Sequence, residues 1–434
     1  MPIEVTLLAL RHARSLLHAL GMPGDPTPKA LHPALAWRRA GLMAVTGRAD
    51  GPGLVAPVAL SAAADGTLAA LRAIAPQATL PDSGSLLLGE RARLLGLRRR
   101  GRISANGSCR LISARGGRMA LNLARPDDWD LVPALLGQPA TDWDAIERIA
   151  AGQARDDLFE RGQLLGLPIA LDEAPPAPAL PFAMHRLGEG RIRTRLPLVI
   201  DLSSLWAGPL AGSLLVSAGA RVVKVESLHR PDGARSGDPR FFDLLNGGKY
   251  SIALDFTASA DVARLGDLVA AADIVIEGSR PRALAQIGID AEEKARRGAT
   301  WISITAHGRE GAAADRVGFG DDAAAAGGLS AAMARGWNEP LFAGDAISDP
   351  LTGLVAALAA WAGWRQGGGL LIDVPMARTV AHGCALYEAT PEELRDWQAL
   401  ANVDQAQLDP MRAAAGVARP LGADHAMLRM LAAS

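Results

Sequence analysis

The chain has 434 residues, 49% of them hydrophobic, and its 45 basic and 46 acidic side chains leave a formal net charge of -1. This length favours two or three globular domains, and the balanced charge gives no support for a nucleic-acid or anionic-membrane partner. The longest nearly apolar stretch, residues 351–364, is too short to span a bilayer. The N-terminus lacks the basic region of a signal peptide, and two cysteines make neither a disulfide framework nor a cysteine metal site, so we expect a cytoplasmic protein.

Two regions of different texture precede a proline-rich segment. Residues 1–95 are rich in Ala and Leu and predict a helical segment with connecting loops. Residues 96–172 predict a small α+β domain in which a β-hairpin turns at Gly116-Gly117. Residues 173–196, which include the run APPAPALP, predict an extended linker because proline interrupts helices.

Beyond the linker, β-branched runs of buried-strand length alternate with helical stretches. The predicted strands are 198–202, 221–225, 251–254, 273–276 and 300–305, and the predicted helices include 210–218, 260–272 and 292–297. This alternation implies right-handed crossovers and a mainly parallel sheet. We therefore expect an α/β large domain over residues 197–390, followed by a C-terminal helical segment over residues 391–434. Ligands of such sheets bind at the carboxyl ends of the strands, where the turns WAGP and EGSRP fall.

An internal repeat relates the N-terminal segment to the large domain. Gly41 and Gly328 are 287 positions apart, and the same offset pairs Gly66 with Gly353, so both copies share one ungapped Gly-to-Gly spacing. We interpret residues 1–95 as part of a degenerate first copy, and the chain as a rearranged or partly deleted tandem.

The chemistry of this chain is expected to rest on carboxylates. The sequence lacks nucleotide-binding glycine motifs, zinc-protease motifs and nucleophile elbows, and its histidines lack metal-ligand spacing, so we expect no metal site. Asp349 is the leading candidate, because it opens the run DPLTG before an apolar stretch. It is aligned with Ala62 in the internal repeat, so only the second copy has a carboxylate at this position. The position suits a helix N-cap with Pro350 as the first helical residue. It also suits a nucleophile, since a carboxylate beside helix amides stays ionised at neutral pH.

Six runs of the second half carry a resemblance to a known family. They are LVIDLSSLWAGPLAGSLLVSAGARVVKVES (198–227), NGGKYSIALDF (246–256), ADIVIEGSRP (272–281), ISITAHGREG (302–311), GFGDDAAAAGGL (318–329) and DPLTG (349–353). In this order they resemble the family III CoA-transferases, a group that includes formyl-CoA and carnitine CoA-transferases and the α-methylacyl-CoA racemases. The resemblance implies a Rossmann-like large domain with CoA across its strand ends, a smaller domain and a homodimer. It also implies that acyl-CoA and a carboxylic acid are the substrates, with no metal or redox cofactor.

The same resemblance assigns roles to single residues. In the transferases an aspartate attacks the donor thioester, and acyl and CoA groups are exchanged through aspartyl-anhydride and aspartyl-CoA intermediates. Asp349 falls on that nucleophile and is the expected catalytic residue, with the backbone amides of Gly327-Gly328 as a candidate source of oxyanion stabilisation. Trp206 could be a buried packing residue as well as a contact of CoA. Arg280 and Arg316 could likewise be solvated surface residues as well as contacts of the CoA phosphates. The residues expected near CoA are Trp206, Ala207, Leu254, Asp255, Gly278, Ser279, Arg280, Arg316 and Phe319.

Two other functions stay open at this point. The racemases pair the same aspartate with a histidine thirty residues earlier, where this chain has Phe319, which cannot transfer a proton. His307 or Asp322 would have to replace that histidine in an acyl-CoA racemase or isomerase. A non-catalytic CoA-binding subunit also stays open, because basic residues that hold the CoA phosphates in family members are replaced here by Ser227 and Gln286. The sequence favours the CoA-transferase over both.

Overall fold

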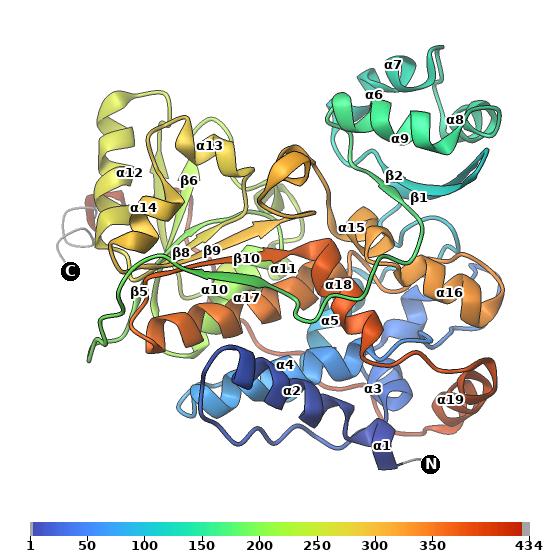
Figure 1. Cartoon of the computed structure of the whole chain (residues 1–434), viewed down its shortest axis with the longest axis horizontal. Coiled ribbons are helices and arrows are strands. Elements are labelled where there is room, and N and C mark those ends of the chain that lie inside the picture. The colour runs from blue at the N-terminus through green and yellow to red at the C-terminus, as the bar shows by residue number, and fades with distance from the viewer. Residues whose placement is uncertain (1–2, 428–434) are drawn as a thin grey trace.

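The computed structural model describes residues 3–427, and a seven-stranded sheet dominates this part of the chain (Figure 1). The strand order is β4-β10-β9-β8-β5-β6-β7. The strands are β4 (Ala183–Arg186), β5 (Leu198–Leu202), β6 (Arg221–Ser227), β7 (Tyr250–Leu254), β8 (Ile274–Glu277), β9 (Thr300–Thr305) and β10 (Leu370–Pro375). Neighbouring strands are parallel except β4, which is antiparallel to β10. The predicted α/β class with a mainly parallel sheet is confirmed, and strands β5 to β10 follow the order 3-2-1-4-5-6 of doubly wound sheets.

Helices cover both faces of this sheet (Figure 1). One face carries α12 (Ser259–Ala271), α13 (Pro281–Ala285) and α14 (Ala291–Arg296), and the other carries α10 (Ala207–Ser217), α11 (Pro239–Asn246) and α17 (Ser348–Arg365). Successive side chains of a strand point to opposite faces, so Val199 packs in the core of the α10–α17 face and Ile200 in that of the α12–α14 face. Burial on both faces explains why the strands are continuous apolar runs. Between β9 and α17 the chain forms η3 (Gly311–Asp315), α15 (Gly320–Ala326) and α16 (Leu329–Trp337), and α18 (Met376–Ala385) follows β10.

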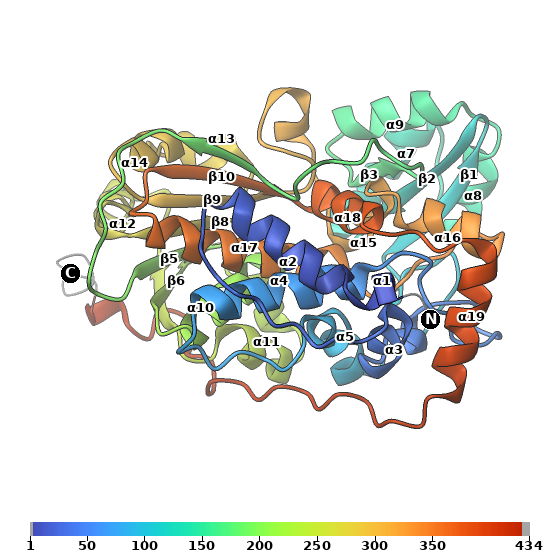
Figure 2. The ribbon, with the colours of Figure 1, turned by 60° about the horizontal axis from the view of Figure 1, so that its bottom comes forward.

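The N-terminal segment forms a further helical layer that packs against α17 (Figure 2). Its elements are α1 (Ile3–Thr6), α2 (Leu8–Ala19), α3 (Pro33–Arg39), η1 (Leu42–Val45), α4 (Leu60–Ile74) and α5 (Gly84–Leu95). Because α17 lies between the sheet, α10 and α4, almost every residue of this helix is buried and its sequence is apolar all round. Within residues 3–427, no helix combines the length and the apolar composition that crossing a bilayer requires.

The N-terminal helices repeat the pairing of α10 with α17. A Cβ on Gly66 of α4 would lie 2.5 Å from the carbonyl oxygen of Ala9 in α2, and a Cβ on Gly353 of α17 would lie 2.6 Å from the carbonyl oxygen of Ala207 in α10. At both positions glycine lets two helix backbones approach closely. The described residues before Cys109 form no strand, so the first copy consists of helices that lack a sheet of their own.

A separate small α+β unit lies between the N-terminal segment and the large sheet in the sequence. Its antiparallel sheet has the order β1-β2-β3, and its helices share a hydrophobic cluster with these strands. The predicted hairpin is present, but its turn is Arg115-Gly116, one residue earlier than expected, because Gly117 already pairs with Ala114 as the first residue of β2. The domain boundaries drawn from the sequence stay predictions. The elements are β1 (Cys109–Ala114), β2 (Gly117–Asn122), α6 (Pro126–Asp130), α7 (Val132–Leu136), α8 (Trp143–Ala150), α9 (Arg155–Leu164) and β3 (Ile169–Leu171).

One predicted segment is extended as expected but also joins the sheet, and another is helical only in part. The proline-rich linker over residues 173–196 includes β4, which uses the backbone groups at the open edge of β10. The expectation of a helical segment over residues 391–434 was wrong in part, because α19 (Pro391–Val403) ends early. Prolines and glycines between 404 and 424 prevent a helix there, and η4 (His425–Met427) follows. Residues 428–434 of this prediction lie outside the described residues.

Candidate active site

The turns that follow β5 and β8 meet where the strand order reverses. The chain leaves β5 for α10 on one face of the sheet, and it leaves β8 for α13 on the other. Gly278, directly after β8, lies against the turn after β5, because a Cβ on this glycine would lie 3.2 Å from Cβ of Ser203. Ligands of doubly wound sheets bind in the crevice at this reversal. The predicted residues Gly278 and Ser279 therefore lie beside the turn that contains Trp206 and Ala207.

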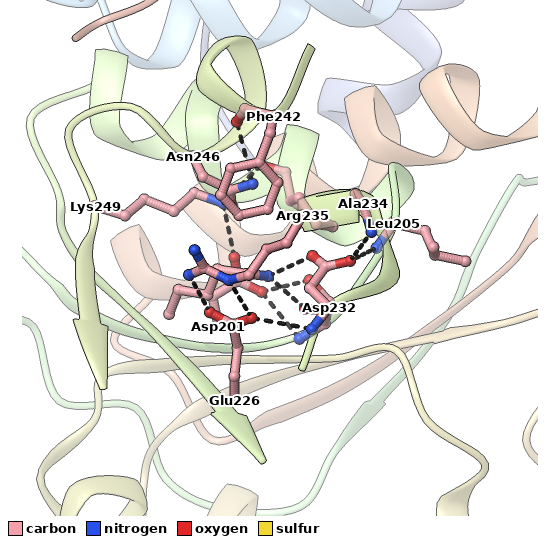
Figure 3. A network of polar contacts seen from close by, with 12 residues as sticks. Asp201, Leu205, Glu226, Asp232, Ala234, Arg235, Phe242, Asn246 and Lys249 are labelled. Atoms are coloured by element: carbon pink, nitrogen blue, oxygen red, sulfur yellow. Dashed lines mark hydrogen bonds and ion pairs between the residues drawn. The ribbon is translucent and has the colours of Figure 1, made fainter. Parts of the chain in front are cut away.

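The turn that leads into α10 has an unusual backbone that buried charges hold in place (Figure 3). Leu205 has a φ of 69°, in the left-handed region that residues with a Cβ rarely adopt. Its N–H donates to Oδ1 of Asp232 at 2.9 Å, and Oδ2 of Asp232 pairs with Nζ of Lys224 at 2.8 Å. Nζ of Lys224 also donates to the carbonyl oxygen of Ser203 at 2.9 Å. These contacts fix the turn on both sides of Leu205.

A second buried lysine holds the first turn of α10. Nζ of Lys249 donates to Oδ2 of Asp201 at 2.8 Å, to the carbonyl oxygen of Pro209 at 2.9 Å and to Oδ1 of Asn246 at 3.1 Å (Figure 3). Burial lowers the pKa of Lys249 to about 8, although the Asp201 carboxylate opposes this shift. The three acceptors match the three donors of an ammonium group, so Lys249 is an anchor for α10.

Asp349 lies in the first turn of α17 and faces the beginning of α10. Its Oδ1 accepts a hydrogen bond from the N–H of Ala207 at 3.3 Å. The prediction that Asp349 is the N-cap was wrong, because α17 starts at Ser348, two residues before the expected Pro350, and its N-cap is Ile347. Oδ2 of Asp349 occupies the space that a Cβ on Gly320 would need, so the beginning of α15 also borders the carboxylate. The carboxylate thus lies where α10, α15 and α17 begin.

Asp349 belongs to a group of acidic residues and is the accessible member of that group. Asp321 and Asp322 of α15 and Asp345 before α17 are buried, whereas Asp349 is only half-buried. Burial raises the pKa of Asp349 to about 7, and the Arg91 guanidinium and the Ala207 N–H oppose this shift. The expectation of an ionised Asp349 took the helix amides into account but not this burial, which favours the protonated form. Burial also raises the pKa of Asp321 to about 7, of Asp322 to about 6 and of Asp345 in the same direction.

A cation from the N-terminal segment borders this acidic group. Nε of Arg91 in α5 lies 3.4 Å from Oδ2 of Asp345, and the guanidinium carbon lies 5.3 Å from the centre of the Trp206 ring. Sequence reasoning missed Arg91, because it lies far outside the runs that carry the resemblance and follows no recognisable motif.

Three of the residues predicted to bind CoA gather around Asp349. Ala207 donates the hydrogen bond described above, and Phe319 directly precedes Gly320. Trp206 is buried and packs edge-on against Phe241, with 5.2 Å between the ring centres. Trp206 is therefore a packing residue at the site, and its contact with CoA stays a prediction.

Of the remaining predicted residues, Leu254 and Asp255 lie at the end of β7, Arg280 lies between β8 and α13, and Arg316 follows η3. Leu254 is buried in the core at the end of β7, and Asp255 after it is half-buried. Arg280 is exposed before α13, and the guanidinium carbon of Arg316 lies 5.2 Å from the centre of the Phe159 ring. CoA contacts stay predictions for Leu254, Asp255, Gly278, Ser279, Arg280 and Arg316.

Comparison with known proteins relates the second half of the chain, which contains this candidate site, to a known family. Residues 198–412 match the family model described as CoA-transferase family III. A succinyl-CoA:glutarate CoA-transferase of Mus musculus is 33% identical over 188 residues, which cover 40% of this chain and 43% of that protein. A succinyl-CoA–D-citramalate CoA-transferase of Chloroflexus aurantiacus is 31% identical over 189 residues, which cover 41% of this chain and 47% of that protein.

A solved structure of a CaiB/BaiF family protein from Brucella suis is also similar. It is 26% identical, and the match covers 50% of this chain and 58% of that chain with a TM-score of 0.38. The chain spans about half the length of the curated relatives it matches.

Proposed function

Residues 198–412 belong to CoA-transferase family III, and from this premise we propose that the chain transfers CoA from an acyl-CoA to a carboxylic acid. The observation that carries the proposal is the position of Asp349. Its half-buried carboxylate lies where α10, α15 and α17 begin, among buried acids that solvent does not reach. A pKa of about 7 leaves a large fraction of this group ionised and nucleophilic at neutral pH.

The proposed reaction proceeds through two kinds of covalent intermediate on Asp349. The carboxylate attacks the thioester carbonyl of the donor, and the C–S bond breaks to give an aspartyl-acyl anhydride and CoA thiolate. The thiolate attacks the aspartyl carbonyl and releases the donor acid as a carboxylate, which leaves an aspartyl-CoA thioester. The acceptor carboxylate then attacks the aspartyl-CoA thioester, which releases CoA thiolate and leaves an anhydride between Asp349 and the acceptor acid. The thiolate attacks the acceptor's acyl carbonyl of this anhydride, which gives the new acyl-CoA and free Asp349.

The candidate amides for oxyanion stabilisation are the N–H of Ala207 and those of Gly327 and Gly328, and they differ in where they point. The N–H of Ala207 already points to Asp349, and it lies at the positive end of the 11-residue helix α10. The prediction that the backbone amides of Gly327 and Gly328 stabilise an oxyanion was wrong, because both amides are used inside a helix end. Their N–H groups donate at 2.9 Å to the carbonyl oxygens of Ala323 and Ala325 within the end of α15. We therefore assign to Ala207 the stabilisation of the oxyanion that forms on Asp349 when the carbonyl carbon of its acylated side chain is attacked.

The structure gives little support to a racemase or isomerase. Phe319 occupies the position of the second proton-transfer group, and burial together with the Arg316 charge lowers the pKa of His307 to about 3. A histidine with so low a pKa is a weak base for removing an α-proton. We also propose that CoA acts only as a substrate, that no metal or redox cofactor takes part, and that the protein is a cytoplasmic homodimer.

Intact-protein mass spectrometry with a panel of acyl-CoAs tests the proposed function. A transferase forms a covalent adduct that hydroxylamine removes, and Asp349→Asn forms none. Uptake of solvent deuterium at the α-carbon without an acceptor acid would identify a racemase instead. Acyl-CoA binding without any adduct or exchange in the wild type would identify a non-catalytic subunit.

A further inference from the structure

Helix α5 brings a positive charge to the site from outside the residues that match the family. Arg91 lies in the N-terminal segment, between the Trp206 ring at 5.3 Å and the Asp345 carboxylate at 3.4 Å. Its side chain is 20% exposed, and that of Asp345 is fully buried. Such a pair is shielded from solvent, so its charges act strongly on neighbouring groups.

We propose that Arg91 is a positioning residue through which the first repeat keeps the carboxylate of Asp349, in the second repeat, in its reactive ionised form. This inference rests on the proposed function of Asp349. It assigns a purpose to an N-terminal segment whose own repeat position holds Ala62 in place of the nucleophile.

The charges that face Asp349 come from three directions. Asp345 precedes it on the way into α17, Asp322 belongs to α15, and Arg91 belongs to α5. The negative charges of Asp345 and Asp322 disfavour ionisation of Asp349, and the positive charge of Arg91 favours it. Without the guanidinium, the neighbouring carboxylates would face Asp349 uncompensated, so the nucleophile would hold its proton to a higher pH.

The inference is tested on the protein without CoA, by infrared titration of the protonated carboxyl band that disappears in Asp349→Asn. Arg91→Gln is expected to move the midpoint of this band upward by about one pH unit or more relative to wild type. Arg98→Gln is the matched control, because Arg98 lies three residues beyond α5 and is exposed. Its midpoint is expected to equal that of wild type.

Three further variants keep the test decisive if Arg91→Gln fails to fold. Asp345→Asn removes a neighbouring negative charge, and Arg91→Gln with Asp345→Asn removes both members of the buried pair, so no unpaired charge remains. The double variant is expected to have a higher midpoint than Asp345→Asn alone, and Arg91→Lys is expected to restore most of the wild-type midpoint. Equal midpoints with and without Arg91 would overturn the inference. Because the titration needs no turnover, its outcome is independent of the transferase proposal, which fails when the wild type forms no adduct or takes up solvent deuterium without an acceptor acid.

Discussion

The backbone N–H of Ala207 donates a hydrogen bond to Oδ1 of Asp349 across 3.3 Å, although 142 residues separate them in the sequence. The close approach of α10 and α17 makes this contact, and the approach depends on Gly353, one turn beyond Asp349. The geometry of Asp349, the proposed nucleophile, therefore depends on how two buried helices pack, and a change of helix spacing is expected to change the rate of the proposed acyl transfer.

Gly353→Ala is expected to impair both stability and acyl transfer. The new Cβ would lie 2.6 Å from the carbonyl oxygen of Ala207, so α10 and α17 must separate, at a cost of about 1–3 kcal/mol that exceeds the helix propensity gained. Gly66→Ala is the matched control, because its Cβ would meet Ala9 at 2.5 Å in the first repeat, away from Asp349. Denaturant unfolding and single-turnover acylation, measured on both variants, separate the effects. We expect similar destabilisation but a loss of rate on the order of tenfold or more only for Gly353→Ala; equal rate losses would contradict this dependence.

Formation of the covalent adduct is expected to depend on pH with a midpoint near 7. The pKa of Asp349 is raised to about 7 by burial, and only the ionised carboxylate attacks a thioester. The single-turnover rate should therefore be constant above pH 8 and fall about tenfold per pH unit below pH 6. A rate that stays constant from pH 5.5 to 8.5 would show that the carboxylate is not desolvated in the reacting state.

The strands and the candidate nucleophile follow from local sequence signals, whereas the electrostatics of the candidate site do not. Runs such as TWISIT over β9 are apolar and β-branched because both faces of the strand are buried, so their type and position are readable from the sequence. Asp349 stands out through its motif and its place in the repeat. Arg91 reaches the site only through the packing of α5, and the pKa of Asp349 depends on the burial that results. The pairing of β4 with β10 depends equally on which sheet edge stays open.

Asp349→Asn is expected to abolish the adduct and to stabilise the fold above neutral pH. The folded-state pKa of about 7 lies above the unfolded value of about 3.9, so the group's stabilising contribution is complete below pH 4 and is lost as pH rises through 7. Asparagine carries no charge, so the variant should exceed wild type by about 1–2 kcal/mol at pH 8, after allowance for partial solvent access, and match it near pH 4. Urea unfolding at both pH values measures the difference. A variant less stable than wild type at pH 8 would contradict a desolvated carboxylate.

Lys249→Met is expected to be among the most destabilising single changes at the site. It removes the partner of the buried Asp201 carboxylate and frees the carbonyl oxygen of Pro209 in the first turn of α10. An unpaired buried charge costs about 3–5 kcal/mol, whereas replacing an exposed lysine such as Lys29 changes stability by no more than about 0.5 kcal/mol. Lys249→Met with Asp201→Asn removes both charges and should recover part of the loss in urea unfolding. If Lys249→Met were as stable as Lys29→Met, the anchoring role of this lysine beneath the α10 turn would have to be abandoned.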